Sequence, residues 1–179
     1  ESDKLNDENL LPELEQNFRG SLNVLDVLPS LNMTLKLAEQ DLKVTNYRFS
    51  ASQSVARPLF REKAPFSVFD FEIQEQQTGN TALNRTKILN IDNRIEVFPG
   101  LRELLSLSVF YKHFTDPIEQ VIISTAANTE ITWKNVESTQ LYGIEFETKK
   151  NLGFLSEKLS ALNAAFNATY IQSATSIAE

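Results

Sequence analysis

Alternation of apolar and polar residues is the feature that most constrains the fold of this chain. Between positions 46 and 55 the residues fall into two sets with a period of two. The apolar set contains Tyr47, Phe49, Ala51 and Val55, and the polar set contains Asn46, Arg48, Ser50, Ser52 and Ser54. A period of two predicts an extended strand whose two faces meet different surroundings. Arg57-Pro58 then ends the strand, because proline cannot donate to a β-ladder.

The same alternation recurs and predicts an all-β fold, an antiparallel meander of about six strands of roughly 10–18 residues each. These strands are expected near residues 30–38, 42–57, 83–98, 104–123, 130–150 and 159–173. Short turns at 38–41, 99–103 and 151–158 alternate with longer connections at 58–82 and near 124–130. Long strands with this asymmetry of connections are typical of transmembrane β-barrels.

The composition and charge of the chain exclude several classes of function but do not distinguish between folds. The 179 residues include 17 basic and 24 acidic ones, for a net charge of −7, and no basic stripe that would bind nucleic acid. There is no cysteine, so disulfides and cysteine metal sites are excluded. The sequence contains no run of 18 or more apolar residues, so no transmembrane helix is predicted. Residues 1–28 are acidic in their first half, and we expect them to form an outer loop or a disordered segment.

Alternation alone leaves two architectures open. A soluble β-sandwich or small barrel, acting as a carbohydrate- or partner-binding module, would alternate in the same way as a membrane barrel. Strand length and the uneven connections favour the membrane barrel. The need for detergent in solution would separate the two alternatives.

Several short segments, in order along the chain, resemble TonB-dependent outer-membrane receptors. The resemblance covers about residues 27–150 and is to the Bacteroidetes-type receptors that carry a carboxypeptidase-regulatory-like domain, a plug and a barrel. The segments that carry it are Leu28-Pro29-Ser30-Leu31-Asn32, the stretch 42–66, Asp70-Phe71, Gly79-Asn80 with Leu83, Arg85 and Thr86, Ser106–Lys112, Asp116-Pro117-Ile118-Glu119 and Tyr142–Glu147.

The resemblance implies a location in the bacterial outer membrane and a function in import. Such receptors form a 22-stranded barrel around a plug, and take up a siderophore, cobalamin or glycan with energy from the TonB complex. No segment here resembles the plug or the aromatic C-terminal strand, so we expect an internal piece from the C-terminal half of the barrel. A piece of this kind has open edges that favour self-association.

The connection after Arg57 is the best candidate for ligand contact. We expect Arg57, Arg61, Asp70 and Arg85 to contact a small polar ligand, with four nearby phenylalanines at 60, 66, 69 and 71. The alternative, which we favour, is that Arg61, Glu62 and Arg85 form a charge network that holds this loop to the barrel wall.

The apolar sets of the strands are expected to face lipid. The residues assigned to this surface are Tyr47, Phe49, Leu105, Leu107, Val109, Tyr111, Phe146 and Phe166. Tyr47, Tyr111, Tyr142, Tyr170 and Trp133 could supply parts of the interfacial aromatic girdles.

Catalysis and metal binding have weak support in the sequence. His113 is the only histidine and has no nucleophile motif near it, so we expect no enzyme. Neither the pair Glu145 and Glu147 nor the pair Asp116 and Glu119 has an evident third metal ligand. We therefore expect the first pair to lie on a solvated strand face and the second pair to lie in a turn. We expect no cofactor. The expected partners are outer-membrane lipid, a plug and the TonB complex.

Overall fold

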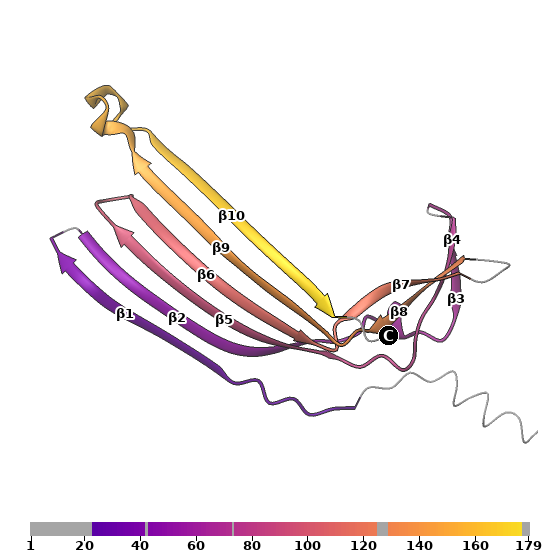
Figure 1. Cartoon of the computed structure of the whole chain (residues 1–179). Coiled ribbons are helices and arrows are strands. Elements are labelled where there is room, and N and C mark those ends of the chain that lie inside the picture. Colours follow the sequence, from indigo (N-terminus) through magenta and orange to yellow (C-terminus); the bar gives the residue numbers. More distant parts are fainter. Residues whose placement is uncertain (1–22, 42, 73, 125–128, 177–179) are drawn as a thin grey trace, which may run out of the picture.

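The computed structural model describes residues 23–41, 43–72, 74–124 and 129–176. Six long strands form one antiparallel sheet in the order β1-β2-β5-β6-β9-β10 (Figure 1). Their bounds are β1 Ser30–Gln40, β2 Lys43–Ala56, β5 Thr86–Phe98, β6 Leu104–Thr115, β9 Ser138–Asn151 and β10 Asn163–Ser176. The predicted all-β fold with long antiparallel strands is thereby confirmed.

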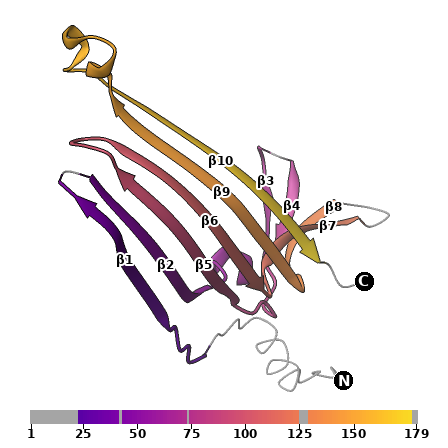
Figure 2. The same cartoon turned by 60° about the vertical axis from the view of Figure 1, so that its left-hand side comes forward.

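A second, four-stranded sheet lies at one end of the long sheet, in the order β3-β4-β8-β7 (Figure 2). Its strands are β3 Ser67–Asp70, β4 Glu75–Thr78, β7 Ile118–Ser124 and β8 Thr129–Asn135. They belong to the β2–β5 and β6–β9 connections, residues 57–85 and 116–137, which together we call the lobe. The lobe lies beyond the ends of the long strands and not across their faces (Figures 1 and 2), so the sheets do not form a sandwich.

We call the end that carries the lobe the loop end, and the opposite end the turn end. At the turn end the chain reverses at Asp41, at residues 99–103 and at residues 152–162. The last of these reversals contains two short 3-10 helices, η2 Leu152–Phe154 and η3 Glu157–Leu159. Short reversals at one end and long connections at the other match the asymmetry of outer-membrane barrels.

Two of the expected strands are each divided in two. Residues 104–123 contain β6 and β7, and residues 130–150 contain most of β8 and then β9, with the shorter strands in the lobe. The first division falls at Asp116, whose φ of 54° is left-handed, and at Pro117, which cannot continue a ladder. The long connection expected at 58–82 holds the helix α2 Phe60–Lys63 as well as β3 and β4. Most of the expected acidic loop, residues 1–22, lies outside the described residues.

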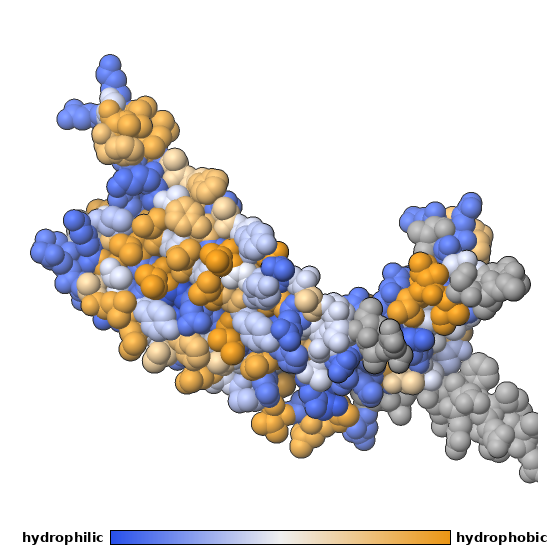
Figure 3. All heavy atoms as spheres, in the orientation of Figure 1, coloured by the Kyte–Doolittle hydropathy of each residue, from blue (hydrophilic) through white to orange (hydrophobic). Residues whose placement is uncertain are grey.

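Cross-strand register gives the long sheet two chemically different faces. Leu107, for example, pairs with Ile95 on one side and with Phe146 on the other. All eight residues expected to face lipid lie on this face, which we call the apolar face. On the other face, the polar face, Ser108 pairs with Arg94 and Glu145. Hydrophobic side chains are spread over the long strands, and others gather on the turn-end tip after β9 and on the lobe (Figure 3).

Buried apolar side chains in the described residues lie in the lobe and not on the long sheet. They are Ala64, Leu83, Ile131 and Val136. All positions of β1 and β10, by contrast, are exposed, and each of these strands pairs on one side only within the described chain. The stability of the long sheet therefore depends on what covers its faces and edges.

Candidate functional site: the lobe and the polar wall

The two long connections are joined into one body by a parallel strand pair. Gln76 and Gln77 of β4 pair with Glu130 and Ile131 of β8. The paired residues of β4 and β8 lie 54 positions apart in the sequence, so this pairing depends on the long sheet bringing the two connections to the same end. The lobe is consequently one surface built from two loops.

Asparagine side chains fasten the lobe together. Asn80 donates through Nδ2 to the carbonyl of Trp133 at 2.9 Å, which links the first connection to the second. Asn135 accepts from the amide of Asn84 at 2.8 Å and donates to the carbonyl of Asp116 at 2.7 Å. These side-chain amides form hydrogen bonds with backbone groups that have no partner in a strand ladder at these positions.

Gly79 allows the closest backbone approach in the lobe. A Cβ at this position would lie 2.1 Å from the carbonyl oxygen of Ala64 and 2.8 Å from that of Arg61. Asn80, the next residue, donates its backbone N–H to the carbonyl of Glu62 at 2.7 Å. The helix α2 is therefore pressed against the end of β4, and only glycine fits between them.

The four residues expected to contact a ligand occupy two separate places. Arg61 lies 3.7 Å from Asp70 at the lobe surface, where 54% of the arginine side chain is exposed. Arg85 donates through Nε to Asp26 at 2.5 Å, and Arg57 lies 3.7 Å from the same carboxylate. The expected scaffold network of Arg61, Glu62 and Arg85 is not found among the described residues, because Arg61 pairs with Asp70 and Arg85 pairs with Asp26.

Glu62 has a local structural role instead. Its Oε2 accepts from the backbone N–H of Leu59 at 2.8 Å and so caps the first turn of α2. Around this turn the lobe exposes a group of large apolar side chains, of which Phe69 and Phe71 form an edge-to-face pair with centroids 5.1 Å apart. The exposed members of this group are Leu59, Phe60, Phe66, Val68, Phe69 and Phe71. An exposed apolar group beside cations suits contact with a ligand.

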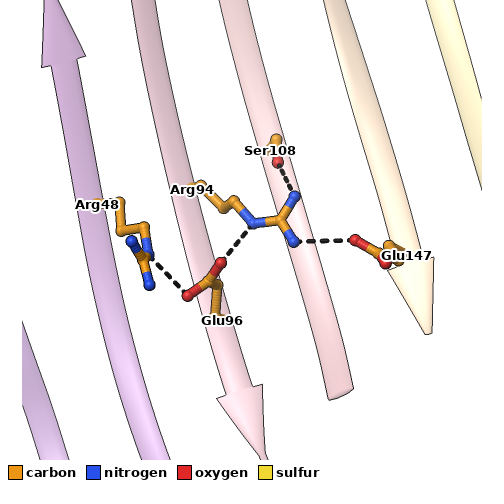
Figure 4. A network of polar contacts seen from close by, with 5 residues as sticks. All are labelled: Arg48, Arg94, Glu96, Ser108 and Glu147. Carbon is orange, nitrogen blue, oxygen red and sulfur yellow. Dashed lines mark hydrogen bonds and ion pairs between the residues drawn. The ribbon is translucent and has the colours of Figure 1, made fainter. Parts of the chain in front are cut away.

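The polar face carries a line of ion pairs that crosses four strands (Figure 4). Glu96 on β5 accepts from Arg48 Nε on β2 and from Arg94 Nε, each at 2.8 Å. Arg94 then donates through Nη2 to Glu147 on β9 at 2.9 Å, and through Nη1 to Ser108 on β6 at 3.3 Å. We call Arg48, Glu96, Arg94 and Glu147 the ion ladder.

Small residues on β6 make the ion ladder possible. Ser106 and Ser108 are buried beneath it, and their short side chains leave room for the guanidinium of Arg94 to cross β6 and reach β9. Alternation in the sequence places Arg48, Arg94 and Glu96 on one wet face. Their pairing depends on a register between distant strands, so the ladder itself could not be predicted from the sequence.

The remaining candidates have structural positions. His113 lies on β6 on the apolar face, opposite Leu89 and Gln140. Trp133 belongs to β8 in the lobe, so the expectation that it joins an aromatic girdle of the wall is wrong. Asp26, which pairs with two arginines, could not be singled out from the sequence, because it is a lone acidic residue in a segment with no strand periodicity.

Neither a metal centre nor a membrane-spanning helix is found in the part of the chain that the structure describes. No three histidine or acidic side chains there are grouped so as to hold a metal ion. No described helix is long and apolar enough to cross a membrane.

Comparison with known proteins identifies a protein family and a solved structure that are similar to this chain. A model of the outer membrane protein beta-barrel family matches residues 7–178. Among solved structures, the siderophore receptor PirA from Pseudomonas aeruginosa is similar, with a TM-score of 0.66 and 18% sequence identity. The similarity covers 83% of this chain and 28% of the receptor chain, so this chain spans less than a third of that receptor's length. No curated protein matches the sequence.

Proposed function

Because this chain belongs to the outer membrane protein beta-barrel family, we propose that it forms part of the barrel wall of a TonB-dependent receptor that imports a scarce ligand. The ligand class is a siderophore, cobalamin or glycan. The observation that carries the proposal is the pair of contrasting faces on one sheet of long strands, with both long connections joined at the same end.

In this proposal the apolar face contacts the hydrocarbon of the outer membrane. Leu105, Leu107 and Val109 are exposed on it, and such a continuous apolar surface is unfavourable in water. The polar face, with the ion ladder, lines the interior of the barrel beside the plug. Neighbouring strands of the same wall pair with the open edges of β1 and β10.

The lobe lies on the outer side of the membrane and makes contact with the ligand. Arg57 and Arg61 are exposed and accessible there, whereas Arg85 is 18% exposed and already engaged with Asp26. We therefore assign ligand contact to Arg57 and Arg61 with the neighbouring phenylalanines. Asp70 orients Arg61, and Arg85 holds the wall together.

The orientation of the two faces can be tested with single cysteines, because the chain has none of its own. Spin labels at Leu107→Cys and Asp92→Cys would be compared in the complete protein in outer membranes. We expect lipid-soluble oxygen to relax the label at position 107 more strongly, and a water-soluble nickel chelate to relax the label at 92. Equal accessibility to nickel at both positions would contradict a lipid-facing apolar side.

The import function requires a separate test. Uptake of labelled ferric siderophores, cobalamin and glycans would be compared in cells with and without the gene. We expect uptake of one compound to depend on the gene, to stop when the proton gradient is dissipated, and to weaken in Arg61→Gln but not in the turn-end control Arg102→Gln. Gene-dependent uptake that continues without the gradient would refute coupling to TonB.

A further inference from the structure

A cavity of about 430 Å³ opens on the apolar face at the loop end. It lies between the ends of β2, β5 and β6 and the segment of residues 23–29, which precedes β1 and which we call the lead-in segment. Its volume is within the range of small-molecule sites, from about 300 to 1,000 Å³. The residues that line it include Leu25, Asp26, Leu28, Arg85, Lys87 and His113.

The cavity lies where the apolar face changes character. On β5 this face is apolar at Ile91 and Leu89 and then carries Lys87, the second residue of the strand. On β6 it is aromatic at Tyr111 and then polar at His113. Under the proposed orientation, this boundary is the level at which the hydrocarbon of the outer leaflet meets the lipid headgroups.

The cavity's surroundings have an excess of positive charge. Asp26 receives Arg85 at 2.5 Å and Arg57 at 3.7 Å, and Lys87 adds a third cation. Within the described residues Lys87 is exposed and forms no ion pair, and Arg85 uses only Nε on Asp26. Three cations against one carboxylate leave donors for an anion such as a phosphate group.

Apolar side chains stand at the mouth of the same cavity. Leu25 is 90% exposed and Val27 is 79% exposed, and both residues line the cavity. A free phosphate ion would use the cations and leave these side chains in contact with water. A phosphate carried by a lipid would use both, because its acyl chains would cover the apolar side chains.

We propose that this cavity binds the phosphate headgroup of a lipid in the outer leaflet, with Lys87 and Arg85 on the phosphate and Leu25 and Val27 on the acyl chains. The lipid would fasten the lead-in segment to the barrel wall. This site rests on the proposed orientation of the wall in the membrane, but not on the identity of the imported ligand.

The test uses the complete protein, purified in a maltoside detergent that carries no phosphate. Native mass spectrometry would count retained molecules of lipid A, of lipid A without its phosphates, and of inorganic phosphate. Variants would be Lys87→Gln at the cavity, Lys112→Gln as a lysine on the polar face of the neighbouring strand, and Leu25→Ser with Val27→Ser at the mouth. All four positions are in contact with solvent or partly so, and the variants are expected to fold.

We expect the wild type and Lys112→Gln to retain lipid A, with occupancy at least fivefold lower in Lys87→Gln and in the double serine variant. Equal retention in Lys87→Gln and the wild type, or equal retention of lipid A without phosphates, would overturn the proposal. Displacement of the lipid by millimolar inorganic phosphate would also overturn it, because the site would then bind a free anion. Uptake measured in parallel distinguishes the two proposals, since lipid retention does not require import.

Discussion

The ion ladder gives the sharpest prediction about stability, at Glu96. This carboxylate accepts hydrogen bonds from Arg48 and Arg94, and its side chain is only 10% exposed. Glu96→Gln keeps the size of the side chain but removes its charge. Asp92→Asn is the matched control, because Asp92 lies on the same face of the same strand and its hydrogen bond, from Ser50 at 3.4 Å, is long.

The magnitude follows from the exposure of each partner. Arg94 is 27% exposed, and a hydrogen bond between charged groups contributes about 1.5–3 kcal/mol. Arg48 is half exposed, so its ion pair contributes only about 0.2–1 kcal/mol. The glutamine still accepts one hydrogen bond of about 1 kcal/mol. We therefore expect Glu96→Gln to lower the free energy of unfolding by about 2 kcal/mol, and Asp92→Asn by less than about 0.5 kcal/mol.

The assay is urea unfolding of the complete protein from phospholipid vesicles, followed by tryptophan fluorescence. A double-mutant cycle with Arg94→Gln isolates the Arg94–Glu96 interaction, for which we expect a coupling energy of about 1–2 kcal/mol. The reasoning fails if Glu96→Gln costs no more than Asp92→Asn, or if the coupling energy lies within the error of the measurement. In either case the ladder would be a set of solvated charges that adds nothing to the wall.

Three further predictions concern the lobe and the turn end. Gly79→Ala should destabilise the lobe by about 1–3 kcal/mol, because the added Cβ would overlap Ala64; limited proteolysis of intact cells would show earlier cleavage in the lobe than in the wild type. Asn135→Ala should give the same early cleavage while the barrel stays resistant, since backbone groups of both connections lose their partner. The hydrogen bond from Lys150 is the main cause that lowers the pKa of Glu103, so the stabilising effect of the carboxylate is present above its ordinary pKa and is lost as pH falls through the lowered pKa. Lys150→Gln should raise the pKa of Glu103 toward its ordinary value and move that loss to higher pH, which a titration of the carboxyl carbon shift by solid-state NMR would detect.

The long sheet could be predicted from the sequence because its information is local. Each strand carries its own alternation, so Leu107 and Ser108 can be assigned to opposite faces without knowledge of their neighbours. The lobe could not be predicted, because β4 and β8 are short and pair across more than 50 positions. The break between β6 and β7 also falls at Asp116, a residue with a left-handed φ, which periodicity does not reveal. The charged residues of the ion ladder, and Asp26, can be read in the sequence. Their ion-pair partners cannot, because these depend on how distant strands are aligned.

The parallel pairing of β4 with β8 also bears on how such a wall can acquire a new specificity. Gln77 of the first connection pairs with Ile131 of the second. Replacing either connection alone, by recombination or by design, would leave the backbone donors and acceptors of the other one without partners at this pairing. Substitutions confined to the exposed side chains around α2 would leave that shared backbone intact. Variation at the ligand surface is therefore expected either as point changes or as the joint exchange of two segments that are separated by 30 residues in the sequence.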